Sequence, residues 1–359
     1  MVESRLRVPE SIAVRVPQEV MRATVEDVFR ALGLSEADAA QSADVLVWAD
    51  IRGVDSHGVS NMMPSYVTGL RAGTINPTPS WTITREALAT ATIDSDRGLG
   101  LSVGPAAMNL AIEKARQCGI GSVVVGNGRH FGAAGYHAAM AVSHDMVGMA
   151  MTVGGLQVPP THGSKPMVGL NPIAVAAPAR NEAPFVFDAS MSAVAGNKIR
   201  VARRLGVPVG PGWIAHTDGT PIMEQALVPE EFQVLPLGAT REIGSHKGYS
   251  LAVVVDILSG LLSGVGAGFL NAGNVSHHFL AYRIDAYTDL EGFKDQMDEF
   301  LKGLRETPSA PGQEPVAYAG LNSARTEAER REKGIPYHPD VIAYYRELAA
   351  ELGINDRLS

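Results

Sequence analysis

Short β-rich runs alternate with helical stretches from about residue 81 onward, and this alternation most restricts how the chain can fold. The pattern predicts strands at 89–93, 122–125, 146–152, 172–177 and 185–188, and helices at 105–117, 133–144, 192–205 and 247–263. No internal repeat is visible. The fold class expected is therefore α/β.

The first seventy or so residues have a different pattern. Pro17 stands where a helix would start, and apolar residues then recur at helical spacing until Gly33. Ser35 is placed as the N-cap of a second helix that runs to about Arg52. We expect a mainly helical N-terminal region at 1–75, an α/β core at 76–320 and C-terminal helices at 321–359, which pack with the N-terminal region.

Composition excludes several classes of function. The formal net charge of -8 gives no overall field for attracting nucleic acid. The single cysteine, Cys118, rules out an intrachain disulfide and a multi-thiolate metal site, and it is expected to be a buried structural thiol. The apolar run 251–262 is too short to span a bilayer, and no signal peptide is recognisable. We expect a cytoplasmic protein without membrane or nucleic-acid partners.

The segment Arg52-Gly53-Val54-Asp55-Ser56-His57-Gly58 is the first candidate for chemistry. His57 has the side chain suited to proton transfer near neutral pH, and Ser56 is placed to hydrogen-bond it or a substrate. Arg52 is placed to grip a carboxylate with its planar guanidinium. The alternative is an ordinary helix C-terminus whose polar side chains satisfy turn hydrogen bonds.

A glycine-rich loop at Gly126-Asn127-Gly128-Arg129-His130-Phe131-Gly132 lies between a predicted strand and helix. Such a loop lets the backbone approach a phosphate, but its spacing is GxGxxxG rather than GxGxxG. Asp145, the nearest downstream acid, comes too late to reach a ribose. We therefore expect no true Rossmann domain, although contact with a cofactor through Arg129 and His130 stays plausible.

Two further segments place polar groups at helix starts. Asp188 ends a predicted strand and precedes Ser190, so these residues either bind ribose and phosphate or form a plain N-cap. His246 and Lys247 precede the most apolar helix, where they either bind phosphate or only cap and solvate it. His277-His278 precede a strand without a third ligand at metal spacing, so they are expected to be structural or on the surface.

Together these segments resemble the malate/L-lactate dehydrogenase family, which also contains sulfolactate and ureidoglycolate dehydrogenases, diketogulonate reductase and piperideine/pyrroline-2-carboxylate reductases. The resemblance runs from about Pro17 to Ile354. It rests on residues 52–58, 130–136, 171–174 and 246–249, which read RGVDSHG, HFGAAGY, NPIA and HKGY.

The resemblance implies a non-Rossmann α/β domain with a mixed sheet that binds NAD or NADP and the substrate. It implies that His57 donates or accepts the proton, with Ser56 as its hydrogen-bonded partner, and that His130 lies in the active site near the nicotinamide and the substrate. The implied cofactor contacts are Asn171, Asp188, Ala189, Ser190, His246 and Lys247, with further contacts near 318–320. The glycine-rich loop adds His130, Phe131 and Gly132 to the expected cofactor contacts. No metal is implied.

The chain departs from the family pattern at three places, of which the mildest is 188–192, where DASMS replaces a DMAT-like string. Asn61 stands where an Arg is common, and Ala319-Gly320-Leu321 replaces the usual Pro-Gly-Glu. The Asp188 carboxylate is kept, and it would repel a 2′-phosphate, which favours NAD slightly over NADP.

The function expected is hydride transfer between a nicotinamide cofactor and C2 of a small 2-oxo or 2-hydroxy carboxylic acid. A reductase of cyclic imino acids is the alternative enzyme, because an iminium also accepts hydride at C2. A non-catalytic ligand-binding protein is a further alternative. The resemblance also implies a homodimer.

Overall fold

The computed structural model describes residues 7–358 of the chain. The first half contains β1 (Val14–Val16), α1 (Gln18–Ala31), α2 (Glu36–Ile51), α3 (Val59–Arg71), β2 (Thr82–Glu86), β3 (Thr90–Asp94), α4 (Gly100–Cys118), β4 (Ile120–Gly128), α5 (Ala134–Met140), β5 (Met146–Val153) and β6 (Ile173–Ala177). The second half contains β7 (Phe185–Ala189), α6 (Gly196–Leu205), β8 (Ile214–Ala215), β9 (Gln233–Val234), α7 (Ser245–Val255), β10 (Val275–Arg283), α8 (Leu290–Arg305), α9 (Leu321–Lys333), β11 (Ile335–Tyr337) and α10 (Pro339–Leu352).

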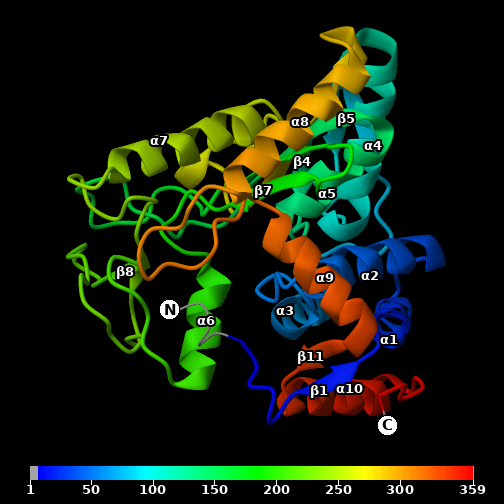
Figure 1. Cartoon of the computed structure of the whole chain (residues 1–359). Helices are drawn as coiled ribbons and strands as arrows, with labels where there is room; N and C mark the ends of the chain where they lie inside the picture. The colour runs from blue at the N-terminus through cyan, green and yellow to red at the C-terminus, as the bar shows by residue number, and fades with distance from the viewer. Residues whose placement is uncertain (1–6, 359) are drawn as a thin grey trace.

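The predicted helical N-terminal region is confirmed. Pro17 directly precedes α1, and Ser35 caps α2 by accepting a hydrogen bond from the Asp38 backbone N–H. Helices α1 to α3 share one buried core with β11 and α10, and β1 pairs with β11. Figure 1 shows α9 running from the sheet towards this helical region, so both ends of the described chain meet there.

The central sheet has seven strands in the order β2-β3-β4-β10-β5-β6-β7. Only β3 and β4 are parallel neighbours, while the other neighbouring pairs are antiparallel. This mixed order confirms the α/β class and differs from the all-parallel Rossmann sheet.

Alternate residues of β5 contact the two layers of helices. Ala150 packs in the core that α4 and α5 cover, whereas Met151 and Val153 pack with Val255 at the end of α7. This period of two is what a strand buried on both faces requires. The sheet therefore lies between α4 and α5 on one face and α7 on the other.

Strand β10 was misplaced by the sequence patterns. His277 and His278 lie within this strand rather than before it, and both are buried. His277 Nδ1 lies 2.8 Å from Thr152 Oγ1, and its Nε2 lies 3.1 Å from the Arg129 carbonyl oxygen. These partners, supplied by β5 and by the residue after β4, satisfy His277, and His278 Nε2 lies 2.8 Å from the Ser122 hydroxyl of β4.

Several predicted helix boundaries were also wrong. Helix α4 begins at Gly100 rather than at residue 105, because its first turn packs under Phe131: a Cβ at Gly100 would lie 2.7 Å from the Phe131 Cβ. Helix α5 ends at Met140, and Val142–His144 form a separate 3₁₀ turn. Helix α6 begins at Gly196 rather than at residue 192.

Helix α7 continues beyond Val255 as a π-helical turn, Asp256–Leu261. The Asp256 carboxylate accepts hydrogen bonds from the Asn171 side chain at 2.7 Å and from the Gly268 backbone at 2.7 Å.

Cys118 is half-buried at the end of α4, with its Sγ 3.6 Å from the Leu88 carbonyl, so it is less buried than expected.

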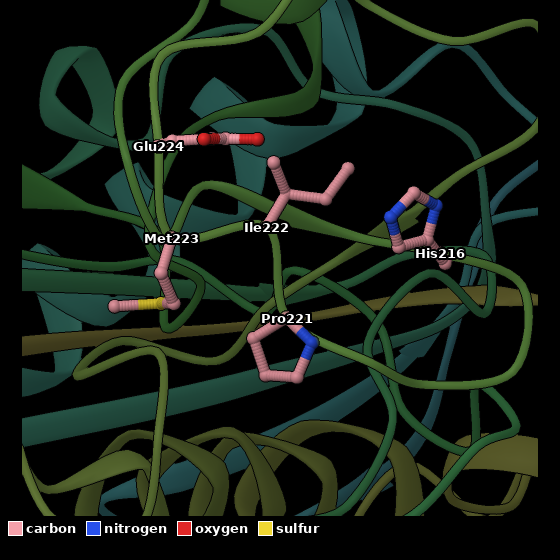
Figure 2. Close-up of a pocket in the computed structure, with 5 residues that line it drawn as sticks. All are labelled: His216, Pro221, Ile222, Met223 and Glu224. Carbon is pink, nitrogen blue, oxygen red and sulfur yellow. The ribbon is translucent and has the colours of Figure 1, made fainter.

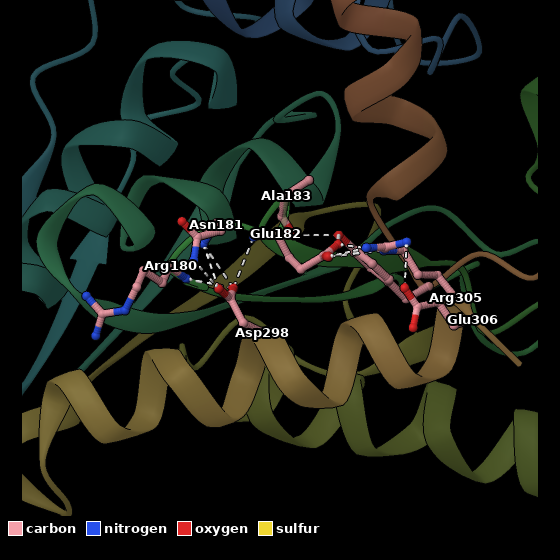
Figure 3. A network of polar contacts seen from close by, with 8 residues as sticks. Arg180, Asn181, Glu182, Ala183, Asp298, Arg305 and Glu306 are labelled. Atoms are coloured by element: carbon pink, nitrogen blue, oxygen red, sulfur yellow. Dashed lines mark hydrogen bonds and ion pairs between the residues drawn. The ribbon is translucent and has the colours of Figure 1, made fainter.

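A polar network fixes the turn between β6 and β7 to α8 (Figure 3). The Asp298 carboxylate accepts from the backbone N–H groups of Arg180, Asn181 and Glu182. Arg305 donates to the Glu182 carboxylate at 2.8 Å. These contacts position the edge strand β7, which carries Asp188 at its end.

No helix among residues 7–358 has both the length and the apolar character needed to cross a membrane.

Candidate active site

The turn between α2 and α3 brings His57 next to His130. Their rings are stacked with centroids 5.9 Å apart and an interplanar angle of 12°. The Ser56 Oγ lies 2.9 Å from His57 Nδ1. The three predicted residues therefore form one cluster, in which both imidazoles are half-buried and keep some contact with solvent.

The tautomer of His130 follows from its hydrogen bonds. The Gly132 backbone N–H donates to His130 Nδ1 at 3.2 Å, and the Tyr66 hydroxyl lies 2.7 Å from the same nitrogen. A backbone N–H can only donate, so Nδ1 accepts and the proton of the neutral ring lies on Nε2. His130 thus presents an N–H donor on the side of the ring away from Tyr66.

Burial keeps both imidazoles neutral. Burial, helped by the charge of Lys198, lowers the pKa of His57 to about 4. Burial also lowers the pKa of His130 to about 3, with smaller contributions from three neighbouring histidines and Arg200. At neutral pH His57 is therefore a free base that can take a proton, and an anion bound beside it would raise its pKa.

The buried carboxylate of Asp50 holds the turn that carries His57. Asp50 Oδ2 accepts from the Val59 backbone N–H at 3.0 Å and from the Tyr337 hydroxyl at 2.9 Å. Burial, helped by the charge of Asp55, raises the pKa of Asp50 to about 7. Arg330 of α9 donates to Asp55 Oδ1 at 2.6 Å, which joins the C-terminal helices to the turn.

Helix α6 covers the same turn, and the sequence patterns did not identify its role. The Asn197 side chain donates to the Ser56 carbonyl at 2.7 Å. Lys198 and Arg200 are close enough to influence the pKa values of His57 and His130 respectively. In the sequence, the only indication that this helix contributes to the site was its basic composition after Asp188. Tyr66 gave no signal, because only the fold brings it to His130.

Arg52 has other partners in this structure. Its guanidinium donates to Glu327 of α9 at 2.6 Å and lies 5.0 Å from the Trp48 ring centroid. Its side chain is 12% exposed. The structure therefore places Arg52 in an ion pair between α2 and α9.

Asp188 lies at the end of β7, beside the start of α5. Its Oδ2 accepts from the Gly135 backbone N–H at 2.7 Å. The residue is exposed, and the protein that surrounds its carboxyl group on the other sides desolvates it enough to raise its pKa to about 6. A Cβ at Gly135 would lie 3.2 Å from Asp188 Oδ2 and 3.5 Å from the Trp48 ring, so the missing side chain keeps this corner open.

The other predicted cofactor residues differ in accessibility. Phe131 is fully buried, and Asn171 is fully buried with its amide donating to the Ala252 carbonyl, so these side chains hold loops in place. Gly132 has a φ of +80°. Ala189 pairs with Ile173 in the sheet, and the Ser190 Oγ accepts from the Ser192 hydroxyl at 2.9 Å.

His246 and Lys247 lie in the first turn of α7. Lys247 is exposed, and His246 Nδ1 lies 2.9 Å from Arg241 Nη1. A hollow of about 290 Å³ borders this helix start; its lining includes Thr161, His162, Arg241 and Ser245. Figure 2 shows a neighbouring pocket, which is lined by His216 and by residues 221–224, shares Pro221 with the hollow and contains none of the predicted site residues.

Phe131 is sandwiched between His137 and His277 directly after His130, with ring centroids 4.5 and 4.6 Å away. Both histidines are fully buried. Burial lowers the pKa of His137 to about 4 and that of His277 to about 3. The floor of the site therefore depends on two histidines that stay neutral.

Acidification is expected to destabilise the fold through these histidines. Below the unfolded-state pKa of about 6.5 the unfolded chain binds more protons than the folded chain, so the free energy of unfolding falls as pH falls towards 4. Asp50 and Asp188 act in the opposite direction, because their pKa values are raised. His277→Asn should reduce the slope of stability against pH by up to ~1.4 kcal/mol per pH unit. Urea titrations between pH 7.5 and 4.5 measure this; a slope equal to that of the wild type would contradict it.

Comparisons with known proteins agree with this geometry. A family model described as malate/L-lactate dehydrogenase matches residues 16–345. The malate dehydrogenase of Pyrococcus abyssi is 39% identical over 348 residues, covering 95% of this chain and 96% of the relative. The L-sulfolactate dehydrogenase of Methanocaldococcus jannaschii is 34% identical, covering 92% and 94%.

A solved structure has the same fold throughout. The malate dehydrogenase of Pyrococcus horikoshii OT3 superposes with a TM-score of 0.88 at 35% identity and covers 97% of this chain and 98% of that one. With the stacked imidazoles, the mixed sheet and near full-length similarity in agreement, the chain belongs to the malate/L-lactate dehydrogenase family and is an oxidoreductase that acts on the CH–OH group of a 2-hydroxy acid.

Proposed function

We propose that the protein transfers hydride between a nicotinamide cofactor and C2 of a 2-hydroxy or 2-oxo acid, with His57 as the group that takes or gives the proton. The observation that carries this proposal is the pair of neutral, partly accessible imidazoles of His57 and His130. A base and a hydrogen-bond donor side by side suit a C2 hydroxyl that becomes a carbonyl.

In this proposal His57 exchanges a proton with the substrate oxygen, and His130 donates a hydrogen bond to it. In the oxidation direction His57 takes the hydroxyl proton, while Ser56 holds the imidazole through its 2.9 Å contact with Nδ1. The His130 Nε2–H donates to the same oxygen as it becomes a carbonyl, and Tyr66 and the Gly132 N–H fix that ring. Microscopic reversibility makes His57 the proton donor in the reduction.

The chain offers groups that fit a dinucleotide. The cofactor, when bound, supplies or accepts the hydride. Asp188, solvent-accessible beside the open corner at Gly135, suits ribose hydroxyls. Lys247, exposed at the start of the 11-residue helix α7, suits a phosphate. We favour NAD over NADP, because an ionised Asp188 that binds a ribose repels a 2′-phosphate.

The relatives guide the choice of substrate. Their names include malate dehydrogenase and L-sulfolactate dehydrogenase, and both substrates carry a second acidic group beyond the 2-hydroxy acid. We propose that this chain also acts on a small 2-hydroxy acid of that kind.

A nicotinamide absorbance assay tests the proposal. Purified protein is mixed with NADH or NADPH and, separately, with oxaloacetate, sulfopyruvate, pyruvate and a cyclic 2-imino acid. We expect the fastest oxidation with NADH and one of the two dianionic 2-oxo acids. Turnover of the cyclic imine alone would replace the proposal with an imino acid reductase.

We also propose a homodimer. From Ser250 to Leu270 the exposed positions carry no charge, and they include Leu251, Val254, Ile257, Leu261, Leu262, Phe269 and Leu270. An exposed apolar surface of this kind is typical of an interface between proteins. Light scattering after size exclusion should give twice the mass of the chain, and Leu261→Asp should shift the population towards the monomer. A wild-type protein that is monomeric at micromolar concentration would contradict this.

A further inference from the structure

Two neighbouring arginines on α6 have different partners. Arg203 Nη2 donates to the carbonyls of Pro229 and Glu230, and its guanidinium lies 5.5 Å from the Phe232 ring centroid. Arg204 Nη2 instead donates to the Asn61 side-chain oxygen at 3.2 Å. Arg203 is thus bonded to the segment that leads to β9, whereas Arg204 reaches across to the segment that carries His57.

Asn61 connects Arg204 to the turn that carries His57. It is buried in the first turn of α3, and its amide Nδ2 donates to the Asp55 carbonyl at 2.8 Å. Its Oδ1 is left to accept from Arg204. His57 follows Asp55 by two residues, in the turn before α3. The Arg204 guanidinium is therefore tied through Asn61 to the backbone of the turn that carries His57.

The charge of Arg204 is not neutralised as the charges of the other arginines at this turn are. Arg52 is paired with Glu327 at 2.6 Å, and Arg330 is paired with Asp55 at 2.6 Å. Arg204 has the neutral Asn61 as its hydrogen-bond partner, and within residues 7–358 it forms no ion pair. Its side chain is exposed, so four of its five N–H donors remain available to an anion.

We propose that Arg204 binds the second acidic group of a dianionic 2-hydroxy or 2-oxo acid, and that it thereby sets a preference for diacids over monocarboxylates. This rests on the proposed function. In this proposal C2 lies at the imidazole pair and the carboxylate or sulfonate on C3 meets the planar pair of donors that the guanidinium offers beside Asn61. Arg204 acts on substrate choice and takes no part in the proton transfer.

Matched single-charge variants test the role. Arg204→Gln and Arg203→Gln each remove one positive charge from α6 and keep an amide donor. We expect Arg204→Gln to lower kcat/KM for oxaloacetate about 10- to 100-fold, mainly through KM, and to leave kcat/KM for pyruvate unchanged. Arg203→Gln should change neither. Arg204→Lys should be intermediate, because it keeps the charge without the planar pair of donors.

Equal losses on both substrates, or the same loss in Arg203→Gln, would overturn the proposal. Calorimetric titration with succinate and with propionate gives a readout that does not depend on turnover. Wild-type protein in the presence of NADH should bind succinate more tightly, and Arg204→Gln should abolish the difference; a difference that is absent from the wild type or kept by the variant would overturn the proposal. If the wild type reduces no 2-oxo acid, the proposed function fails, while the succinate titration still decides the role of Arg204.

Discussion

Replacement of His57 by Asn is expected to lower kcat about 100- to 10,000-fold, because general acid–base catalysis by a positioned side chain contributes that much. Asn keeps a polar group next to Ser56 but cannot exchange a proton near neutral pH. The KM for the cofactor should change little, since His57 lies in the turn before α3 and not at the proposed cofactor residues. Steady-state rates in both directions measure the effect.

His144→Asn is the matched control. This histidine is exposed at the end of a 3₁₀ turn, where its Nδ1 lies 2.9 Å from Arg116 Nη2. It should retain wild-type kcat. If His57→Asn also retains wild-type turnover, His57 does not transfer the proton, and His130 would become the candidate.

Gly121→Ala is expected to lower the free energy of unfolding more than any other variant proposed for this protein. A Cβ at this position of β4 would lie 1.9 Å from the carbonyl oxygen of Ala111 in α4, which is backbone and cannot move alone. Helix α4 presents small buried residues to the strand, including Ala107, Ala111 and Ala115. Separating helix from sheet should cost about 3 kcal/mol or more in the free energy of unfolding. Thermal and urea unfolding measure this loss.

Gly303→Ala is the control for the same chemical change. Gly303 lies in α8, is exposed, and has no heavy atom within 4 Å of its added Cβ. Alanine in an exposed helix should stabilise the protein by about 0.5–1 kcal/mol. A Gly121→Ala variant as stable as wild type would show that α4 and β4 are not packed as closely as described.

Local patterns predicted the parts of the fold that depend on neighbours in sequence. The cap at Ser35 and the apolar spacing after Pro17 are read within one or two helical turns, and both elements formed as expected. Strand β10 depends on residues far away, since Thr152 and the Arg129 carbonyl provide the partners that let His277 be buried. A strand containing two histidines and a serine lacks the apolar run that marks a buried strand.

The residues of the candidate site also fall into those that local motifs predicted and those that only long-range packing places. The motifs predicted Ser56, His57 and His130, because proton-transfer chemistry restricts the residue types, and the fold brings these three side chains together. Long-range packing decided the rest. Arg52 was assigned to the substrate on its type alone, but its partner Glu327 lies on α9. Tyr66 and helix α6 enter the site only when the chain folds.

An isotope experiment tests the hydride-transfer proposal directly. NADH deuterated at both C4 positions is incubated with the protein and the best 2-oxo acid from the assay, and the product is examined by NMR. Direct transfer predicts one deuterium at C2 of the 2-hydroxy acid. Unlabelled NADH in D₂O should then leave C2 undeuterated, because the proton that His57 supplies goes to oxygen. Deuterium that reached C2 from the solvent, and not from the cofactor, would contradict hydride transfer between nicotinamide and C2.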